Sequence, residues 1–251
     1  IVKSTLVLLT KYVLIIVAMY SAPTFACSKT LIMGTNETNW PSDIKKLNNG
    51  YSGAELKVIK LIFEAADFCV KIQHIPSLSR VHKELKEGRI DFTFSASYTK
   101  KRAEYGYFSE PYRLEKMKLF KHAVSPDVNS LAQVFEQGFT LSINRGSYYG
   151  PEVAKYKKHY ADQIVYTSHA NNRADMLSKH RVDYSVEEMR VARPFLKKYD
   201  NILAVKNIKS IYTNPVHFMF SKKSVTLTEV NTINTLILSK QAAVDKIYQL
   251  H

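Results

Sequence analysis

Short apolar segments alternate with amphipathic segments from residue 27 to the end of the chain. The segment 54–68 (AELKVIKLIFEAADF) places Leu56, Ile59 and Ile62 on one face and charged residues on the other. This spacing predicts an amphipathic helix. The segment 70–75 (VKIQHI) alternates apolar and polar residues instead, which predicts a half-buried strand.

The same order of strand and helix recurs along the chain, which predicts an α/β fold. Parallel strands with right-handed crossovers are the usual arrangement of such a series. Further strands are expected at residues 30–34, 90–95, 117–123, 140–143, 163–166, 182–186, 202–205 and 216–220. Further helices are expected at residues 79–87, 130–137, 152–159, 171–179, 188–199, 226–238 and 240–250. Gly88 directly follows one of them and suits the left-handed residue that commonly ends a helix.

Polar residues follow several of these strands at the end where α/β proteins bind ligands. In open α/β sheets the ligand crevice lies beyond the carboxyl ends of the strands. The three segments to inspect first are therefore residues 34–36 (GTN), 95–97 (SAS) and 144–147 (NRGS).

The first 26 residues differ in character from the rest. Lys3 precedes an apolar run at residues 12–20, and small residues lead up to Ala26. This order is typical of a secretory signal peptide that is cleaved after Ala26. An uncleaved membrane anchor is the alternative, but Lys11 interrupts the apolar stretch, and a span needs about 20 apolar residues. We therefore expect export to the periplasm.

The chain has two cysteines, Cys27 and Cys69. In an exported protein we expect them to form a disulfide. Closing a loop of about 40 residues would stabilise the fold by about 4 kcal/mol in the chain-entropy treatment. Cleavage after Ala26 would also leave Cys27 first, which opens an alternative as a membrane-anchored lipoprotein acylated at Cys27.

Charge does not point to nucleic acid. The formal net charge of +14 falls to +12 once Lys3 and Lys11 are removed with the signal peptide. Lys and Arg are scattered along the chain and form no stripe with interleaved aromatic residues, so a nucleic-acid partner is not expected. A basic surface would nevertheless attract anionic ligands.

The segment 88–113 (GRIDFTFSASYTKKRAEYGYFSEPYR) carries the most chemical information. Ser97, Thr99 and Arg102 come directly after an expected strand. A guanidinium pairs with a carboxylate through two parallel hydrogen bonds, and hydroxyl groups share the same oxygens. The segment is therefore suited to grip a carboxylate.

This segment resembles the family 3 bacterial extracellular solute-binding proteins, the periplasmic receptors of amino-acid ABC importers. The resemblance lies in Gly88-Arg89-Ile90-Asp91, Ser95-Ala96-Ser97, Thr99-Lys100-Lys101-Arg102 and Phe108-Ser109-Glu110-Pro111-Tyr112. Weaker matches are Gly34-Thr35-Asn36, Trp40-Pro41, Gly50-Tyr51-Ser52-Gly53 and Arg181-Val182-Asp183, so the resemblance spans nearly the whole mature chain.

The resemblance implies a periplasmic-binding-protein-like fold, in which two lobes joined by two crossing strands hold a ligand between them. It places residues 27–116 and 216–251 in lobe 1 and residues 117–215 in lobe 2. Arg102 and Ser97 are expected at the ligand carboxylate, Ser147 is expected to help from lobe 2, and Ser95 is a further expected ligand contact. The family's ammonium-binding acid corresponds to Glu188, where the family usually has Asp. Asn36, Trp40 and Arg80 are the remaining candidate ligand contacts.

Each candidate also has a purely structural interpretation. Arg102 would then pair with Glu104 or Glu110 on the surface. Ser97 and Ser147 would cap helices, and Glu188 would be an acid in the first turn of a helix. Trp40 would be a packing residue, and Arg80 would lie on an exposed helix face.

No catalytic or metal-binding motif accompanies these residues. Zinc-ligand spacings, a nucleophile elbow and a phosphate-binding glycine loop are absent from the sequence. We therefore expect a monomeric binding protein without metal or cofactor that delivers an amino acid or small carboxylate to a membrane ABC permease. The alternatives are a dehydratase-like enzyme of the same fold and a stand-alone periplasmic sensor.

Overall fold

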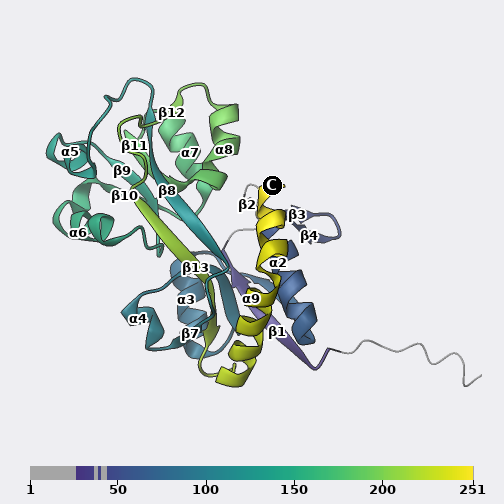
Figure 1. Cartoon of the computed structure of the whole chain (residues 1–251). Coiled ribbons are helices and arrows are strands. Elements are labelled where there is room, and N and C mark those ends of the chain that lie inside the picture. The colour runs from purple at the N-terminus through teal and green to yellow at the C-terminus, as the bar shows by residue number, and fades with distance from the viewer. Residues whose placement is uncertain (1–26, 37–38, 41–43, 251) are drawn as a thin grey trace, which may run out of the picture.

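The computed structural model describes residues 27–36, 39–40 and 44–250, with the backbone alone at residues 39, 40 and 46. The expected signal peptide, residues 1–26, lies outside the described residues. Two lobes of strands and helices are joined by two long strands, β8 (Arg113–His122) and β13 (Tyr212–Ser221) (Figure 1). Within the described residues, no helix has the combined length and hydrophobicity of a membrane span.

Lobe 1 is built around β1 (Lys29–Thr35), which pairs in parallel with β5 (Phe68–His74) and β6 (Phe92–Ser97). Its helical elements are α2 (Ala54–Phe63), η1 (Glu64–Ala66), α3 (Leu78–Glu87), α4 (Lys100–Ala103) and α9 (Leu227–Gln249). Short strands β2 (Asn39–Trp40), β3 (Ile44–Leu47) and β4 (Gly50–Ser52) form a separate antiparallel sheet, and β7 (Gly106–Phe108) pairs with β13.

Lobe 2 repeats the parallel arrangement on a smaller scale. β9 (Leu141–Asn144) pairs in parallel with both β10 (Ile164–Thr167) and β11 (Tyr184–Glu188). The remaining elements are β12 (Ile202–Ala204), α5 (Leu131–Glu136), α6 (Pro151–His159), η2 (Ala161–Gln163), α7 (Ala170–Ser178) and α8 (Met189–Lys198).

The two crossing strands make the sheet continuous from one lobe to the other. β8 and β13 pair antiparallel from Arg113↔Val216 to Met117↔Tyr212, and the strand order is β10-β9-β11-β8-β13-β6-β1-β5. A second link lies beside them, where Nη1 of Arg190 on α8 donates to the carbonyl of Tyr248 at the end of α9, 2.9 Å away.

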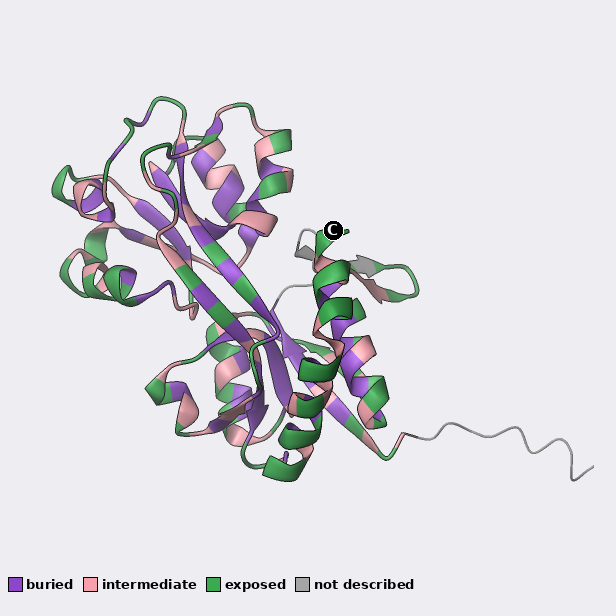
Figure 2. Ribbon diagram, in the orientation of Figure 1, coloured by how far each residue is buried: buried purple, intermediate pink, exposed green. Residues whose placement is uncertain are grey.

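Each lobe has its own hydrophobic core (Figure 2). In lobe 1 the fully buried ring of Phe63 stacks on Phe92 at 4.5 Å between centroids and meets Phe218 edge-on at 5.3 Å. The buried apolar clusters of lobe 1 draw on residues 31–112 and 216–244, and those of lobe 2 draw on residues 117–205. Packing inside the described chain is therefore largely confined to each lobe.

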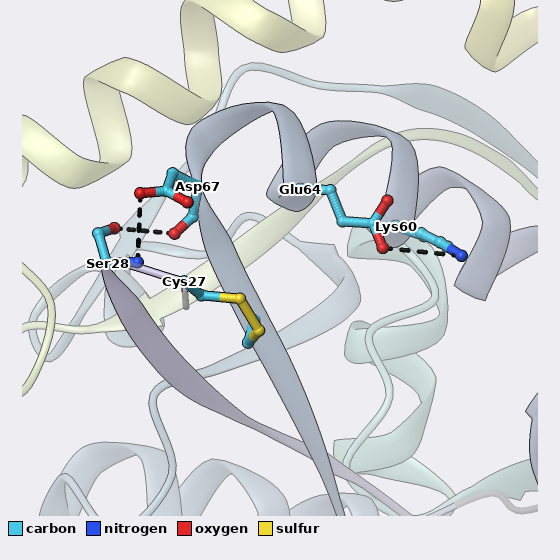
Figure 3. The surroundings of a disulfide bond; sticks show 6 residues. Cys27, Ser28, Lys60, Glu64 and Asp67 are labelled. Carbon is cyan, nitrogen blue, oxygen red and sulfur yellow. Dashed lines mark hydrogen bonds and ion pairs between the residues drawn. A yellow bond between two sulfur atoms is a disulfide. The ribbon is translucent and has the colours of Figure 1, made fainter. Parts of the chain in front are cut away.

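A disulfide joins Cys27, just before β1, to Cys69 on β5, as the sequence predicts (Figure 3). The two positions are 42 residues apart, and their Cα atoms lie 5.6 Å apart. Beside the bond, the Ser28 hydroxyl donates to the carbonyl of Asp67 at 2.8 Å. Because the Cys27 sulfur is taken up by this bond, the alternative of a lipoprotein acylated at Cys27 is not supported.

Some expected element boundaries are wrong. The helix expected at 54–68 ends at Phe63, because Asp67 adopts a left-handed conformation with φ 60° and the chain then enters β5. The two helices expected at 226–238 and 240–250 form the single helix α9, which nothing in the sequence around Ser239 interrupts. The strands β2–β4 and β7 and the short helix α4 were not expected.

Candidate functional site

A cavity of about 80 Å³ lies between the two lobes, beyond the carboxyl ends of the central strands. Lobe 1 lines it with Thr35, Asn36, Leu78, His82, residues 93–97 and Arg102. The crossing strand β8 and lobe 2 contribute Glu115, Met117, Asn144, residues 147–149, Arg173, Glu187, Glu188 and Val191. All three strand-end segments named from the sequence contribute to this lining.

Arg102 lies at this cavity and is buried. Thr99 is the N-cap of α4 and accepts the Arg102 backbone N–H, which fixes Arg102 one turn beyond β6. Its guanidinium donates to the carbonyl of Ser97 at 2.7 Å and to the carbonyl of Gly146, in lobe 2, at 2.8 Å. Burial lowers the pKa of this guanidinium, against the opposing charge of Glu115. Neither Glu104 nor Glu110 is among its described partners, so the surface-pair interpretation does not hold.

Ser95 and Ser97 lie beside Arg102 at the end of β6. Ser97 Oγ accepts from Nδ2 of Asn214, on the crossing strand β13, at 2.8 Å. Ser95 adopts a left-handed φ of 47°, and its Oγ accepts from Nη2 of Arg113, on β8, at 2.9 Å. Neither serine caps a helix, since that role at α4 belongs to Thr99. These hydrogen bonds connect the expected carboxylate end of the cavity to both crossing strands.

The loop after β9 supplies the opposite wall. Nδ2 of Asn144 donates to Ser147 Oγ at 3.0 Å, and its backbone N–H donates to the Tyr149 hydroxyl at 2.9 Å. Burial raises the pKa of Tyr149 to about 12, so the ring stays neutral. The N-cap of α6 is Gly150, so Ser147 does not cap that helix and faces the cavity instead.

Three carboxylates share the Arg113 guanidinium, and one of them is Glu55, whose Oε2 lies 3.8 Å from Nε. Glu188, the last residue of β11, lies 3.6 Å from Nη1 of Arg113, and Glu115 accepts from Nη2 of the same guanidinium at 3.1 Å. Burial opposes the charge on Arg113, but Glu115 and Glu188 outweigh it and raise its pKa. Glu188 precedes α8 without a side-chain cap bond. A buried ion pair of this kind fixes the positions of its members more than it stabilises the fold.

Glu187 takes part in a separate pair. The Arg173 guanidinium donates to both of its carboxylate oxygens, with Nη2 to Oε2 at 3.1 Å. Successive residues of a strand point to opposite faces, and Glu187 is bound to Arg173 whereas Glu188 lies beside Arg113. The two carboxylates therefore do not form one acid–base couple.

His82 on α3 has no protein partner for either ring nitrogen, although both are buried against the cavity. Burial, followed by the charge of Arg102, lowers the pKa of His82 to about 3, so the ring is neutral at physiological pH. Asn144 Oδ1 is also buried without a hydrogen-bond partner. Buried polar atoms in native proteins nearly always have partners, so these atoms mark places where a ligand or water completes the network.

The lobes touch each other around the cavity. Nδ2 of Asn36 donates to the carbonyl of Ser168, in lobe 2, at 3.0 Å. A Cβ atom on Gly146 would lie only 2.7 Å from the backbone nitrogen of Ser79, and Gly146 has a positive φ of 91°. Together with the bond from Arg102 to the carbonyl of Gly146, these contacts hold the two walls close together.

Six of the candidates are thus brought together at one cavity, namely Asn36, Ser95, Ser97, Arg102, Ser147 and Glu188. Arg80 is not among them, because its side chain is 61% exposed, pairs with Glu84 at 3.0 Å and does not line the cavity. The side chain of Trp40 lies outside the described residues. Within the described residues, no three His, Cys, Asp or Glu side chains are grouped so as to hold a metal ion.

Sequence reasoning missed His82, Glu115, Arg173 and Glu187 as cavity residues. His82 lies on an amphipathic helix without a motif, and the charged residues occupy positions that a local pattern assigns to solvent. Asn144 belongs to one of the strand-end segments expected to line the crevice, although it is not among the candidate ligand contacts.

Comparison of the sequence with profiles of known protein families identifies the family. The sequence profile of the bacterial extracellular solute-binding proteins, family 3, matches residues 31–249. The chain belongs to this family. No curated protein sequence matches the chain as a relative.

Solved structures share the fold of this family 3 protein over most of its length. An ancestral arginine-binding protein bound to arginine is 22% identical, covers 88% of this chain and 96% of its own, and has a TM-score of 0.75. A histidine kinase sensor domain with similarity to periplasmic binding proteins is 18% identical, with 89% and 96% covered and a TM-score of 0.75. The ancestral amino acid-binding protein AncCDT-1, a precursor of cyclohexadienyl dehydratase, is 17% identical, with 88% and 94% covered and a TM-score of 0.73.

Proposed function

We propose that this protein is a periplasmic substrate-binding protein that captures a small amino-acid-like or carboxylate ligand between its lobes for import by an ABC permease. The observation that carries the proposal is the buried guanidinium of Arg102, whose described hydrogen bonds go to two backbone carbonyls, one from each lobe. Moving a charge out of water is costly unless an opposite charge compensates it. A ligand carboxylate supplies that charge in the cavity.

The opposite end of the cavity suits the rest of an amino acid. Glu115 and Glu188 line it, and both are buried. We propose that Glu188 receives the ligand's ammonium group, while Ser97 and Ser147 share the carboxylate with Arg102. The arginine-bound structural neighbour supports an amino acid as the ligand class.

We further propose that the lobes divide at residues 116/117 and 215/216, inside β8 and β13, and that they close by bending these strands. The confinement of the hydrophobic clusters to residues on either side of these positions supports the division. Hinge closure of two domains around a ligand is the established behaviour of periplasmic binding proteins. Export through cleavage after Ala26 and a monomeric state complete the proposal.

A thermal-shift screen with amino acids and small carboxylates tests this function directly. A ligand at 100 times its Kd adds about 2.7 kcal/mol of stability, which corresponds to a rise in Tm of roughly 5–10 °C for a chain of this size. Arg102→Met should abolish the shift, whereas Lys101→Met, an exposed neighbour on the same short helix, should preserve it. The absence of any shift across a broad panel would refute the proposal.

The two alternatives have their own tests. The sensor-domain and dehydratase-precursor neighbours share this fold, so each alternative has a structural precedent. Conversion of arogenate or prephenate by the purified protein would favour the enzyme. A permease and an ATPase encoded beside the gene would favour import over a sensor role.

A further inference from the structure

We propose that His82 is a ligand-contacting residue, and that its imidazole N–H donates to the same carboxylate that Arg102 holds. This inference rests on the proposed function and adds a residue that neither the motifs nor the resemblance points to. It gives the carboxylate end of the site two donors from lobe 1, one charged and one neutral.

The first argument is that both ring nitrogens of His82 are buried without partners, although the residue as a whole is half-buried. Both nitrogens of His82 are shielded from solvent and have no hydrogen-bond partner in the protein. A structural histidine in a folded core normally donates from one nitrogen and accepts at the other, because an unmade bond at a buried polar atom is costly. Nothing in the packing of α3 requires a polar side chain here, since the neighbouring Val81 and Leu85 are fully buried apolar residues.

The second argument is the charge around the ring. His82 lies close enough to Arg102 for the guanidinium to disfavour a proton on the imidazole. Burial, and after it the charge of Arg102, also lowers the pKa of Lys157 in lobe 2. The group that fits among these neighbours is an anion, and a neutral imidazole can donate a hydrogen bond to it without adding charge.

The third argument concerns the ligand class. A neutral imidazole has one N–H donor and one nitrogen acceptor. The donor suits a carboxylate oxygen, and the acceptor nitrogen suits an N–H or O–H of the ligand. Asn144 Oδ1 is buried without a partner in the opposite wall, so it can accept a hydrogen bond from a second donor on the ligand. The ligand class is therefore a carboxylate that also bears hydrogen-bond donors, which describes an amino acid better than a simple fatty or dicarboxylic acid.

The inference makes an unusual pair of predictions for His82→Leu. Replacing a ring whose two nitrogens are buried without partners by an apolar side chain removes an uncompensated cost in the ligand-free protein, so its Tm should rise by about 2–6 °C at pH 7.5. The same substitution removes a hydrogen bond to the ligand, so Kd should increase by about 5- to 150-fold. A structural role predicts the opposite pair, a lower Tm with an unchanged Kd.

The experiment measures Tm and Kd for the full chain, with L-arginine, L-histidine, L-glutamine, L-glutamate and succinate as probes in isothermal titration calorimetry. His82→Gln keeps an N–H donor and should recover part of the affinity lost in His82→Leu. Lys83→Leu, at the exposed next position of α3, is the matched control and should change neither quantity in this way.

The outcomes separate the inference from the proposed function. If the wild-type protein binds a probe and His82→Leu binds it equally well, the inference fails and the function stands. An unfolded or less stable His82→Leu variant also overturns the inference. If the wild-type protein binds none of the probes, the proposed function fails and the inference fails with it.

Discussion

Acid should destabilise this protein through His82, by an amount that the structure allows us to estimate. Burial and Arg102 lower the pKa of His82 to about 3 in the folded state, whereas an unfolded chain has the ordinary value of 6.5. Below pH 6.5 the His82 side chain binds a proton in the unfolded chain but stays neutral in the folded protein. Stability is therefore fully present above pH 6.5 and is lost as the pH falls from 6.5 towards 3.

The size of the loss follows from the difference between the two pKa values. Each pH unit below 6.5 costs about 1.4 kcal/mol until the folded-state pKa is reached. At pH 5 the loss through this one residue is about 2 kcal/mol, which corresponds to a fall in Tm of roughly 4–8 °C.

The assay compares urea unfolding of the wild-type protein and His82→Leu at pH 8 and pH 5. Burial also lowers the pKa of His217 and of His122, but both residues are present in the two proteins, so their contributions cancel in the difference. The variant should lose about 2 kcal/mol less than the wild type between the two pH values. Parallel losses in the two proteins would refute the burial of a neutral ring at this position.

Three further predictions concern the frame of the site. Cys69→Ser should lower the free energy of unfolding by about 4 kcal/mol in urea titrations, and added reductant should destabilise the wild type but not the variant. Gly146→Ala should weaken ligand binding in calorimetry with little change in the cooperativity of unfolding, because its Cβ would meet the Ser79 backbone at 2.7 Å and hold the lobes apart; unchanged affinity would contradict this contact. Phe63→Ala should cost about 3–5 kcal/mol in chemical unfolding, since this ring is fully buried among other aromatic rings; a loss below 1 kcal/mol would argue against the packing.

Local sequence patterns are sufficient for much of the fold. A short apolar segment predicted β1, the alternation of residues 70–75 predicted β5, and Gly88 marks the end of α3 with a left-handed φ of 76°. Both crossing strands begin before the expected residues 117 and 216, at Arg113 and Tyr212, and the early part of β8 contains the charged residues Arg113 and Glu115, both of which are buried. Hydropathy cannot distinguish a solvated charge from one that is neutralised by a residue from another part of the chain.

Some residues of the candidate site could be predicted from local sequence and others could not. The strand-end rule and the Thr-x-x-Arg spacing led to Ser97 and Arg102, because both depend on short stretches of sequence. Arg173 and Glu187 are paired across 14 residues in sequence, and His82 faces a cavity whose far wall belongs to the other lobe. The first pair forms when lobe 2 folds, and the second neighbourhood forms only when the two lobes meet, so no local pattern encodes either.

The link between Arg190 and the carbonyl of Tyr248 puts the carboxyl-terminal turn of α9 against the opposite lobe. If the lobes rotate relative to each other as proposed, a group attached to the last turn of α9 would change its local environment with that rotation. An environment-sensitive dye attached there would report ligand binding by a change in its fluorescence. A bulky purification tag at the same place would hinder the movement of the lobes.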